Sequence, residues 1–417
     1  MQFKLLNNYK MISKIACSLV GAFSVLIVYE ATQSLIFTGV YLLAKNIIRL
    51  ICGLTMRKQI QRHPEIFLML RMVVIGLYCF SLTIISQYVI LGCFLAALLS
   101  GVDASFQMIA EETLFNYASS QNMDSKRIAR TRVFEELGYF AGVIAGGLIL
   151  DVNQIVVYAL CIVIYLIAIC PLFIFYLRNK KNPTFNKEYV SNMYESVTKS
   201  DTKLPKMKHL ITMLLLSYTA IYLCYSISDA VSGIFNLGLF VESDISYSYA
   251  SVFIIIFRLA FLVGNLVVSY LDKKFDLLNV VRVSCWVISL SFVGLCFVKN
   301  VWILYICFAL FGFFYASICC FVLQRFVQKT RILGQSNNAF MVRELSGAGG
   351  LSIGFVVFLV FILLDLSIFW YFLYCALMLI VTSFVIPALE EKTRRMLVDF
   401  VEDNEINPES IARNNEN

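Results

Sequence analysis

The chain has 417 residues, of which 60% are hydrophobic and only 15% are charged, with a net charge of +7. Soluble proteins carry about 45–50% apolar and about 25% charged residues, so a soluble enzyme of this size would lack the polar surface that it needs. The composition therefore predicts a protein that is solvated by lipid.

Apolar stretches long enough to cross a bilayer recur along the chain. A membrane helix needs about 20 apolar residues, and short polar breaks mark where one crossing ends and the next begins. On this basis the sequence predicts twelve transmembrane helices. Their expected ranges are 12–32, 34–56, 66–86, 88–115, 132–150, 153–177, 209–236, 247–271, 278–298, 300–324, 337–364 and 367–388.

Basic residues between these stretches fall almost entirely on one side of the membrane. When the loops are counted alternately, one side holds 27 of the 34 lysines and arginines, and the other holds Lys299 alone. Cytoplasmic loops are the ones that keep lysine and arginine, so both chain ends are expected in the cytoplasm of a multi-pass cell-membrane protein. Anionic lipid headgroups account for the net charge, and no nucleic-acid partner is expected.

One long polar interruption divides the chain into two halves. Residues 178–208 contain eight basic residues, two prolines and no apolar stretch, and six predicted helices lie on each side. We expect an N-terminal six-helix bundle over 1–177, a cytoplasmic linker over 178–208, a C-terminal six-helix bundle over 209–389 and an acidic cytoplasmic tail over 390–417.

Short sequence matches relate the two halves. At an offset of 211 residues, Gly53 and Arg71 recur as Gly264 and Arg282. At an offset of 208, a Glu-Leu pair and two glycines recur at the start of the fifth and eleventh predicted helices. These positions are Glu136, Leu137, Gly142 and Gly146, and Glu344, Leu345, Gly350 and Gly354. Matches near half the chain length indicate a duplicated architecture.

With two related halves of six predicted helices each, the chain resembles the major facilitator superfamily over essentially its whole length. The segment VVSYLDKKFD (267–276) matches the family's Asp-basic-basic-aromatic loop, whereas the first copy has Gln61 in place of the Asp. The fifth predicted helix reads GYFAGVIAGG (138–147), similar to the signature G-P-x-x-G-G with Val143 in place of proline. The fourth reads LLSGVDASF (98–106), similar to the SGxDxA segment of many bacterial members.

The resemblance implies an all-α membrane protein with twelve transmembrane helices in two six-helix bundles. It also implies a central cavity, lined mainly by the first, fourth, seventh and tenth helices, that opens alternately to the two sides. The expected function is secondary active transport of a small organic solute by a monomer, with proton coupling left open. The alternatives are an exporter of drugs or hydrophobic compounds, and a membrane receptor that kept the fold without transporting.

The seventh predicted helix carries the first candidate for substrate contact. Tyr218, Tyr222, Tyr225 and Asp229 recur at i, i+4, i+7 and i+11, which places three phenols and a carboxylate on one helical stripe. Phenols offer a flat apolar face and a polar tip, which suits an amphiphilic organic solute. Packing between helices is the alternative interpretation.

Ionised side chains inside the apolar stretches are further candidates for substrate contact or coupling. Each costs at least about 2.5–3.5 kcal/mol to insert, so each is expected to face water or a partner. Asp103 is expected either to act as a protonation site or substrate counter-charge, or to pair with Lys45 or Arg49 of the second helix. We favour the pairing. Glu30, Lys45 and Arg258 complete this set of candidates.

Other charges gather near the expected cytoplasmic helix ends. They lie around the loop between the fourth and fifth helices and near the cytoplasmic ends of other helices, including those of the second half. We expect them to form gate ion pairs that close the cytoplasmic mouth, with ordinary solvated charges as the alternative for part of the set. The gate candidates are Arg49, Glu111, Glu112, Arg132, Glu136, Asp272, Lys273, Arg343 and Glu344. Glycines 138, 142, 146 and 147 predict a smooth face for close packing between the halves.

The sequence contains no pattern that indicates catalysis. It has no phosphate-binding G-x-x-x-x-G-K-[ST] loop, no HExxH and no Ser/His pair within a predicted helix. The 13 cysteines lack CxxC or Cys/His metal spacing and are expected to be small buried side chains. We therefore expect neither an enzyme nor a cofactor or metal site.

Replacing Tyr222 with Ala is expected to impair transport while membrane insertion stays intact, because the substitution removes a contact group and leaves the helix apolar. Solute uptake into proteoliposomes and the amount of protein in the membrane fraction measure the two effects. Unchanged transport kinetics after separate alanine substitutions of all three tyrosines would rule out the stripe.

Overall fold

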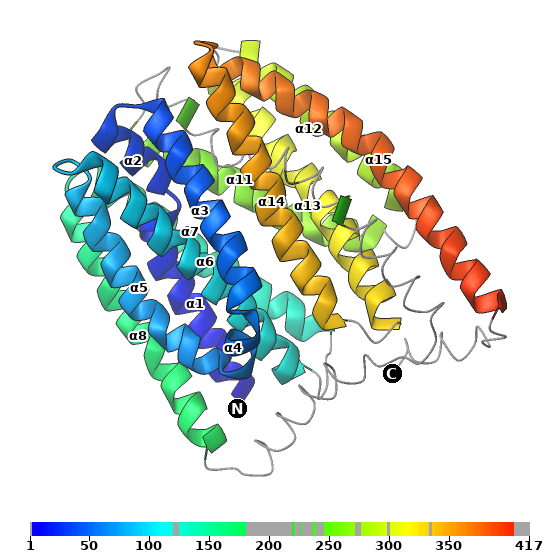
Figure 1. Ribbon diagram of the computed structural model, residues 1–417, viewed down its shortest axis with the longest axis horizontal. Helices are drawn as coiled ribbons and strands as arrows, with labels where there is room; N and C mark the ends of the chain where they lie inside the picture. The colour runs from blue at the N-terminus through cyan, green and yellow to red at the C-terminus, as the bar shows by residue number, and fades with distance from the viewer. Residues whose placement is uncertain are drawn as a thin grey trace.

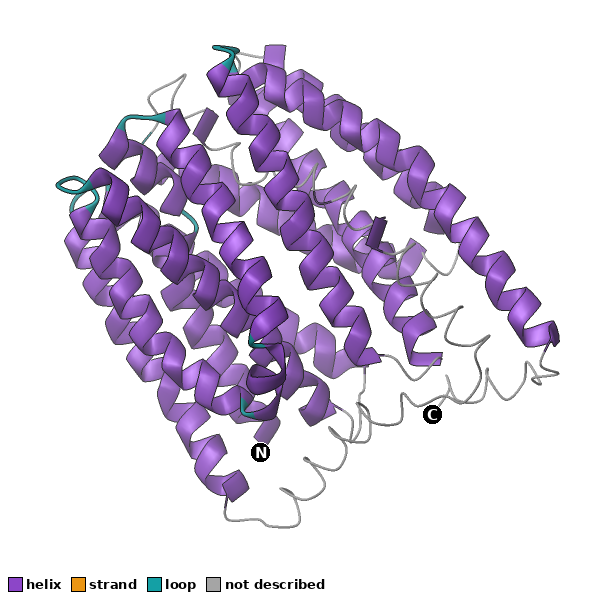
Figure 2. Cartoon of the chain, in the orientation of Figure 1, coloured by secondary structure: helices purple, strands orange, loops and turns teal. Residues whose placement is uncertain are grey.

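A computed structural model describes residues 2–119, 125–180, 219–220, 226, 237–238, 246–271, 277–297, 301–332 and 336–403. Within these ranges every regular element is a helix (Figures 1 and 2). Ten helical stretches of this described part are long and apolar enough to cross a membrane. The all-α membrane fold is therefore confirmed.

The N-terminal half reproduces the first six predicted spans. The first span consists of two helices, α1 and α2, and the short helix α4 lies between the second and third spans. The elements are α1 (Gln2–Gly21), α2 (Ser24–Thr32), α3 (Leu35–Thr55), α4 (Arg57–Arg62), α5 (Pro64–Ile84), α6 (Val89–Ser119), α7 (Ser125–Leu150) and α8 (Gln154–Lys180).

The C-terminal half contains a helix for each of five further predicted spans. The seventh predicted span, 209–236, lies almost entirely outside the described residues. The elements are α11 (Tyr247–Leu271), α12 (Leu277–Phe297), α13 (Val301–Ile332), α14 (Ser336–Leu363) and α15 (Ile368–Asp403).

The start of α1 and the end of α15 lie at the same end of the bundle (Figure 1). We call the opposite end the distal end. It carries the connections from α2 to α3, from α7 to α8 and from α14 to α15, which are residues 33–34, 151–153 and 364–367. This arrangement agrees with an even number of crossings.

The first span is interrupted near its distal end, whereas the sequence predicts one continuous helix. Ala22 and Phe23 form a turn in which the Phe23 amide donates to the Val20 carbonyl over 3.1 Å. Gly21, a weak helix former, precedes the turn, and the fully buried Phe23 side chain anchors it. Helical hydrogen bonding resumes where the Ile27 amide donates to the Phe23 carbonyl over 2.9 Å.

The glycine face of α7 packs within its own half, which corrects the expectation of an interface between halves. A Cβ added to Gly138, Gly142 or Gly146 would lie 2.4, 2.4 or 2.6 Å from a carbonyl oxygen of α1. Spacing by four residues places these three glycines on one face, so α1 can approach closely there. Only Gly147, one position further round the helix, meets the other half, at Ser251.

A second close approach occurs once in each half. A Cβ added to Gly101 of α6 would lie 2.6 Å from the Lys45 carbonyl oxygen of α3. A Cβ added to Gly312 of α13 would lie 2.1 Å from the Phe257 carbonyl oxygen of α11. The offset of 211 residues carries Gly101 onto Gly312, so this helix contact repeats in the duplicated halves.

In the described part of the chain, two pairs of helices make the most extensive contacts between the halves. The helix α7 packs against α11, where a Cβ added to Gly147 would lie 2.8 Å from the Ser251 Cβ. The helix α3 packs against α14, where a Cβ added to Gly39 would lie 2.6 Å from a methyl carbon of Leu359. Both glycine contacts lie toward the distal end, because Gly39 is near the start of α3 and Gly147 is near the end of α7.

The substitution Gly142→Ala is expected to lower the melting temperature, because its Cβ would lie 1.9 Å from the Ser18 hydroxyl oxygen. Overpacking of this kind costs about 1–3 kcal/mol, or several degrees. The matched control is Gly76→Ala within α5, where no atom lies within 4 Å of the added Cβ. Thermal unfolding of the purified variants in detergent measures both, and equal melting temperatures would contradict the packing described here.

Candidate functional site

A fully buried arginine forms the centre of the N-terminal half. Arg71 lies on α5, and its side chain has no exposed surface. A guanidinium stays ionised in proteins and has five N–H groups to satisfy, so burial in an apolar bundle requires several acceptors. The neighbouring helices α1 and α6 supply them.

Two carboxylates from α6 contact Arg71. Its Nε and Nη2 donate to the two oxygens of Asp103 over 2.8 and 3.1 Å, a two-point ion pair. Its Nη1 donates to Glu111 over a longer distance of 3.4 Å. The side chain of Asp103 is 19% exposed and that of Glu111 is 8% exposed. Glu111, a gate candidate from the sequence, is thus part of a buried cluster within one half.

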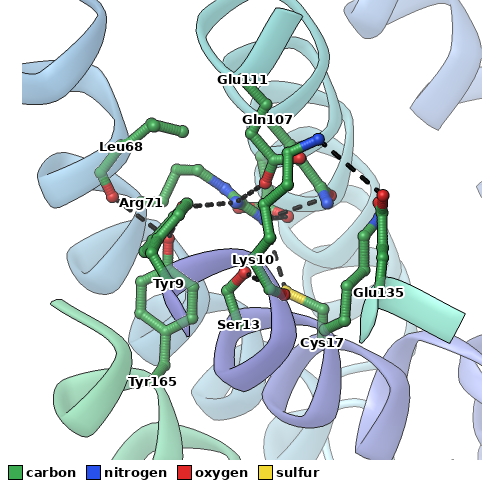
Figure 3. A network of polar contacts seen from close by, with 12 residues as sticks. Tyr9, Lys10, Ser13, Cys17, Leu68, Arg71, Gln107, Glu111, Glu135 and Tyr165 are labelled. Carbon is green, nitrogen blue, oxygen red and sulfur yellow. Dashed lines mark hydrogen bonds and ion pairs between the residues drawn. The ribbon is translucent and has the colours of Figure 1, made fainter. Parts of the chain in front are cut away.

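Neutral groups complete the shell around the guanidinium (Figure 3). Arg71 donates to the Tyr9 hydroxyl over 3.2 Å, to the Gln107 side-chain oxygen over 3.2 Å and to the Cys17 sulfur over 3.3 Å. The Tyr165 ring centre lies 5.4 Å from the guanidinium carbon, and its hydroxyl lies 3.2 Å from that of Tyr9. The cluster therefore joins α1, α5, α6 and α8.

The spacing along α6 explains how this helix supplies three acceptors. Asp103, Gln107 and Glu111 are separated by four residues each, so they lie on one stripe of the helix. Sequence reasoning selected the two acids and missed Gln107, although the four-residue spacing is visible in the sequence.

The structure corrects the expected partner of Asp103. Asp103 pairs with Arg71 of the third span rather than with Lys45 or Arg49 of the second. The backbone of α3 is what faces α6 at those positions, because the Arg49 carbonyl accepts the Ser105 hydroxyl over 3.0 Å. Lys45 and Arg49 are half-buried on α3. Arg71 was missed as a site residue, although a lone arginine within an apolar span is a signal for one.

A second group of charges joins α1 to α7. Glu135 lies 3.1 Å from the Lys14 ammonium and 3.8 Å from the Lys10 ammonium. Lys10 is on the same helix as Tyr9 and Cys17, so α1 carries polar groups toward both α7 and the Arg71 cluster (Figure 3).

The next residue of α7 connects the two halves. Glu136 lies 3.5 Å from a terminal nitrogen of Arg258 on α11, and the Arg258 guanidinium stands over the Tyr139 ring at 4.4 Å. The adjacent acids Glu135 and Glu136 thus bind basic groups of different helices. The Arg258 side chain is 34% exposed, so it is only partly covered by the protein.

We call these three groups of ion pairs, with four basic and four acidic side chains in all, the charge belt. It runs from the Arg71 cluster through α1 and α7 to α11. Its members are Lys10, Lys14, Arg71, Arg258, Asp103, Glu111, Glu135 and Glu136. Opposite charges are balanced within this set, which is what an apolar surrounding requires.

Glu30 lies away from the charge belt, at the distal end. It accepts a hydrogen bond from the Gln154 side chain over 2.8 Å and another from the Tyr247 hydroxyl. Tyr247 begins α11, so this contact also joins the two halves.

Several site residues selected from the sequence cannot be placed. Tyr218, Tyr222, Tyr225, Asp229, Asp272 and Lys273 lie outside the described residues. Four further candidates lie on α6, α7 and α14, but their side chains are not described. These residues are Glu112, Arg132, Arg343 and Glu344.

Comparisons with known proteins agree on one fold. A family profile described as the Major Facilitator Superfamily matches residues 13–342. No curated protein matches the sequence significantly.

Three solved transporter structures resemble the chain along nearly its whole length. The nucleoside transporter NupG has a TM-score of 0.64 at 12% identity, with 92% of this chain and 98% of that chain covered. A bacterial homologue of the iron transporter ferroportin, outward-facing, has a TM-score of 0.61 at 16% identity, with 94% and 100% covered. The POT family transporter PepTSo has a TM-score of 0.66 at 10% identity, with 94% and 98% covered. At these identities the likeness concerns the fold alone.

Replacing Arg71 with Met is expected to destabilise the protein strongly, because two acids buried beside it lose their cationic partner. Breaking a buried pair in this way costs about 3–5 kcal/mol, or roughly 3–6 °C in melting temperature for a chain of this length. Adding Asp103→Asn to Arg71→Met is expected to restore part of the loss. Thermal unfolding in detergent measures each variant.

The matched control is Arg395→Met on α15. Arg395 pairs with Glu391 over 3.1 Å but is 76% exposed, and exposed pairs contribute about 1 kcal/mol or less. Equal losses at Arg71 and Arg395 would contradict a buried electrostatic centre.

Proposed function

This chain belongs to the major facilitator superfamily, and we propose that it is a secondary active transporter. It moves a small organic solute across the cell membrane by alternating access of its two halves. The chain ends and the highly basic loops face the cytoplasm, so the distal end faces outward.

The observation that carries this proposal is the ion pair between Glu136 and Arg258. It joins α7 of one half to α11 of the other, within stretches apolar enough to cross a membrane. A charged pair between two membrane bundles is costly unless it faces water or changes partners. An interface at which two halves move against each other meets this condition, because water enters on one side at a time.

We propose the proton as the coupling ion and Glu111 as the group that takes it up. Arg71 contacts Asp103 through two short hydrogen bonds but reaches Glu111 through a single one at 3.4 Å. Protonating Glu111 therefore gives up less ion pairing than protonating Asp103 does. Among the acids of the Arg71 cluster, Glu111 is the one held by a single, longer contact with the guanidinium.

The proposed substrate is organic, and the tyrosine stripe of the seventh helix remains the proposed contact surface. The similar structures include a nucleoside transporter and a homologue of an iron transporter, so the shared fold does not select one substrate. The test panel therefore includes nucleosides, short peptides, sugars, amphiphilic drugs and iron.

A pH jump across proteoliposomes that contain the purified protein, run with this panel, tests the proposal. Flux of one organic solute that depends on the imposed gradient is expected, and the sign of the flux gives the direction. Equilibrium binding without flux would support a receptor instead, and flux of iron alone would contradict an organic substrate.

In the variant Glu111→Gln, gradient-driven flux is expected to fall at least 10-fold, because an amide cannot take up the coupling proton. Exchange of labelled for unlabelled solute without a gradient is expected to continue, because that exchange needs no net proton movement. Glu391→Gln, on the exposed part of α15, is the control and should retain both activities. Gradient-driven flux that survives in Glu111→Gln would exclude Glu111 as the coupling group.

A further inference from the structure

The first turn of α11 is capped by a carboxylate from the other half. The Tyr247 and Ser248 amides donate to the two oxygens of Asp151 over 2.8 and 3.1 Å, and the Ser248 hydroxyl donates to Asp151 as well. Asp151 lies between α7 and α8, so the N-terminal half satisfies the beginning of a C-terminal helix.

Such a cap has a clear physical basis. The first amides of a helix lack partners within the helix, and a negative charge is stabilised at this end by the helix dipole. Ser246, at the start of α11, accepts the Tyr249 amide over 3.3 Å. The two preceding amides are the ones that depend on Asp151.

A second carboxylate, that of Glu30, binds the Tyr247 side chain in the same turn. The Tyr247 hydroxyl donates to Glu30, which also accepts the Gln154 side chain over 2.8 Å. The Tyr247 ring stands edge-on against Phe23, with 5.8 Å between ring centres. Tyr247 is therefore fixed to the N-terminal half through both its backbone and its side chain.

The donors to these two carboxylates, among the described residues, are amides and hydroxyls that carry no charge. Separation of the two halves at this point therefore leaves no buried cation behind. Glu30 and Asp151 are already exposed, so water can replace the lost donors when the contact breaks. These contacts are suited to reversible release.

We propose that Glu30, Asp151, Gln154, Tyr247 and Ser248 form a distal latch, which holds the distal end closed and must release before that end opens. The stability of these latch contacts then sets the equilibrium between conformations with a closed and with an open distal end. The role of the latch in a transport cycle rests on the proposed function, whereas its effect on opening can be measured without any solute.

Asp151→Ala removes the cap, and Asn153→Ala is the matched control. Asn153 lies two residues away and accepts the Ile155 and Val156 amides over 2.9 and 3.4 Å, so it caps α8 of its own half. Tyr247→Phe is a milder variant, because it removes only the hydroxyl bond to Glu30 and keeps the ring against Phe23.

Hydrogen–deuterium exchange of the full chain in lipid nanodiscs, without solute or gradient, tests the latch. The readout is the distal contact of α3 with α14 near Gly39 and Leu359, which the substituted side chain does not touch. In Asp151→Ala we expect amide exchange there to rise about 10-fold or more, since the loss of even one of its three hydrogen bonds to a charged group corresponds to about that change. Tyr247→Phe should give a smaller rise, and Asn153→Ala none.

Faster exchange confined to 247–251, or an equal effect of Asn153→Ala, would overturn the latch and leave Asp151 as a local cap. If Asp151→Ala does not fold, Tyr247→Phe alone decides, and an unchanged rate at the distal contact of α3 with α14 overturns the proposal. Because no solute is present, absence of transport in the separate flux assay has no bearing on this result.

Discussion

The need to neutralise a guanidinium inside an apolar bundle organises the N-terminal half. Arg71 remains ionised, and hydrocarbon offers it no acceptors. Asp103 and Glu111 supply the charge, and Tyr9, Cys17 and Gln107 supply the remaining contacts. Since these groups come from α1 and α6, the position of α5 relative to both helices is fixed electrostatically as well as by packing.

The helix α7 makes different kinds of contact on its two faces, with α1 of its own half and with α11 of the other half. Its glycine face meets α1 so closely that an added Cβ would collide with the α1 backbone. Its other face carries Glu136, Tyr139 and Gly147 toward α11, where the contacts are a long ion pair, a ring face and small side chains. The helix α7 therefore packs against backbone within its own half, whereas its contacts with α11 are partly polar.

The all-α membrane fold could be predicted from the sequence, because apolar length is a property of single segments. The predicted partner of Asp103 was wrong, since a periodic pattern shows which face a residue occupies but not which helix lies opposite. The same limit explains why the glycines of α7 were assigned to the wrong neighbour. Glu136 and Arg258 were each selected from their charge, and only the packing of α7 on α11 brings them together.

The turn at Ala22 and Phe23 gives the first span two mechanically separate parts. The segment before the turn is tied to the Arg71 cluster through Tyr9 and Cys17, and the segment after it is tied to α11 through Glu30. The turn interrupts the regular helical hydrogen-bond ladder, so the two segments do not form one continuous rod. Displacement of the outer segment can therefore be absorbed locally, and the buried charges need not be strained each time it occurs.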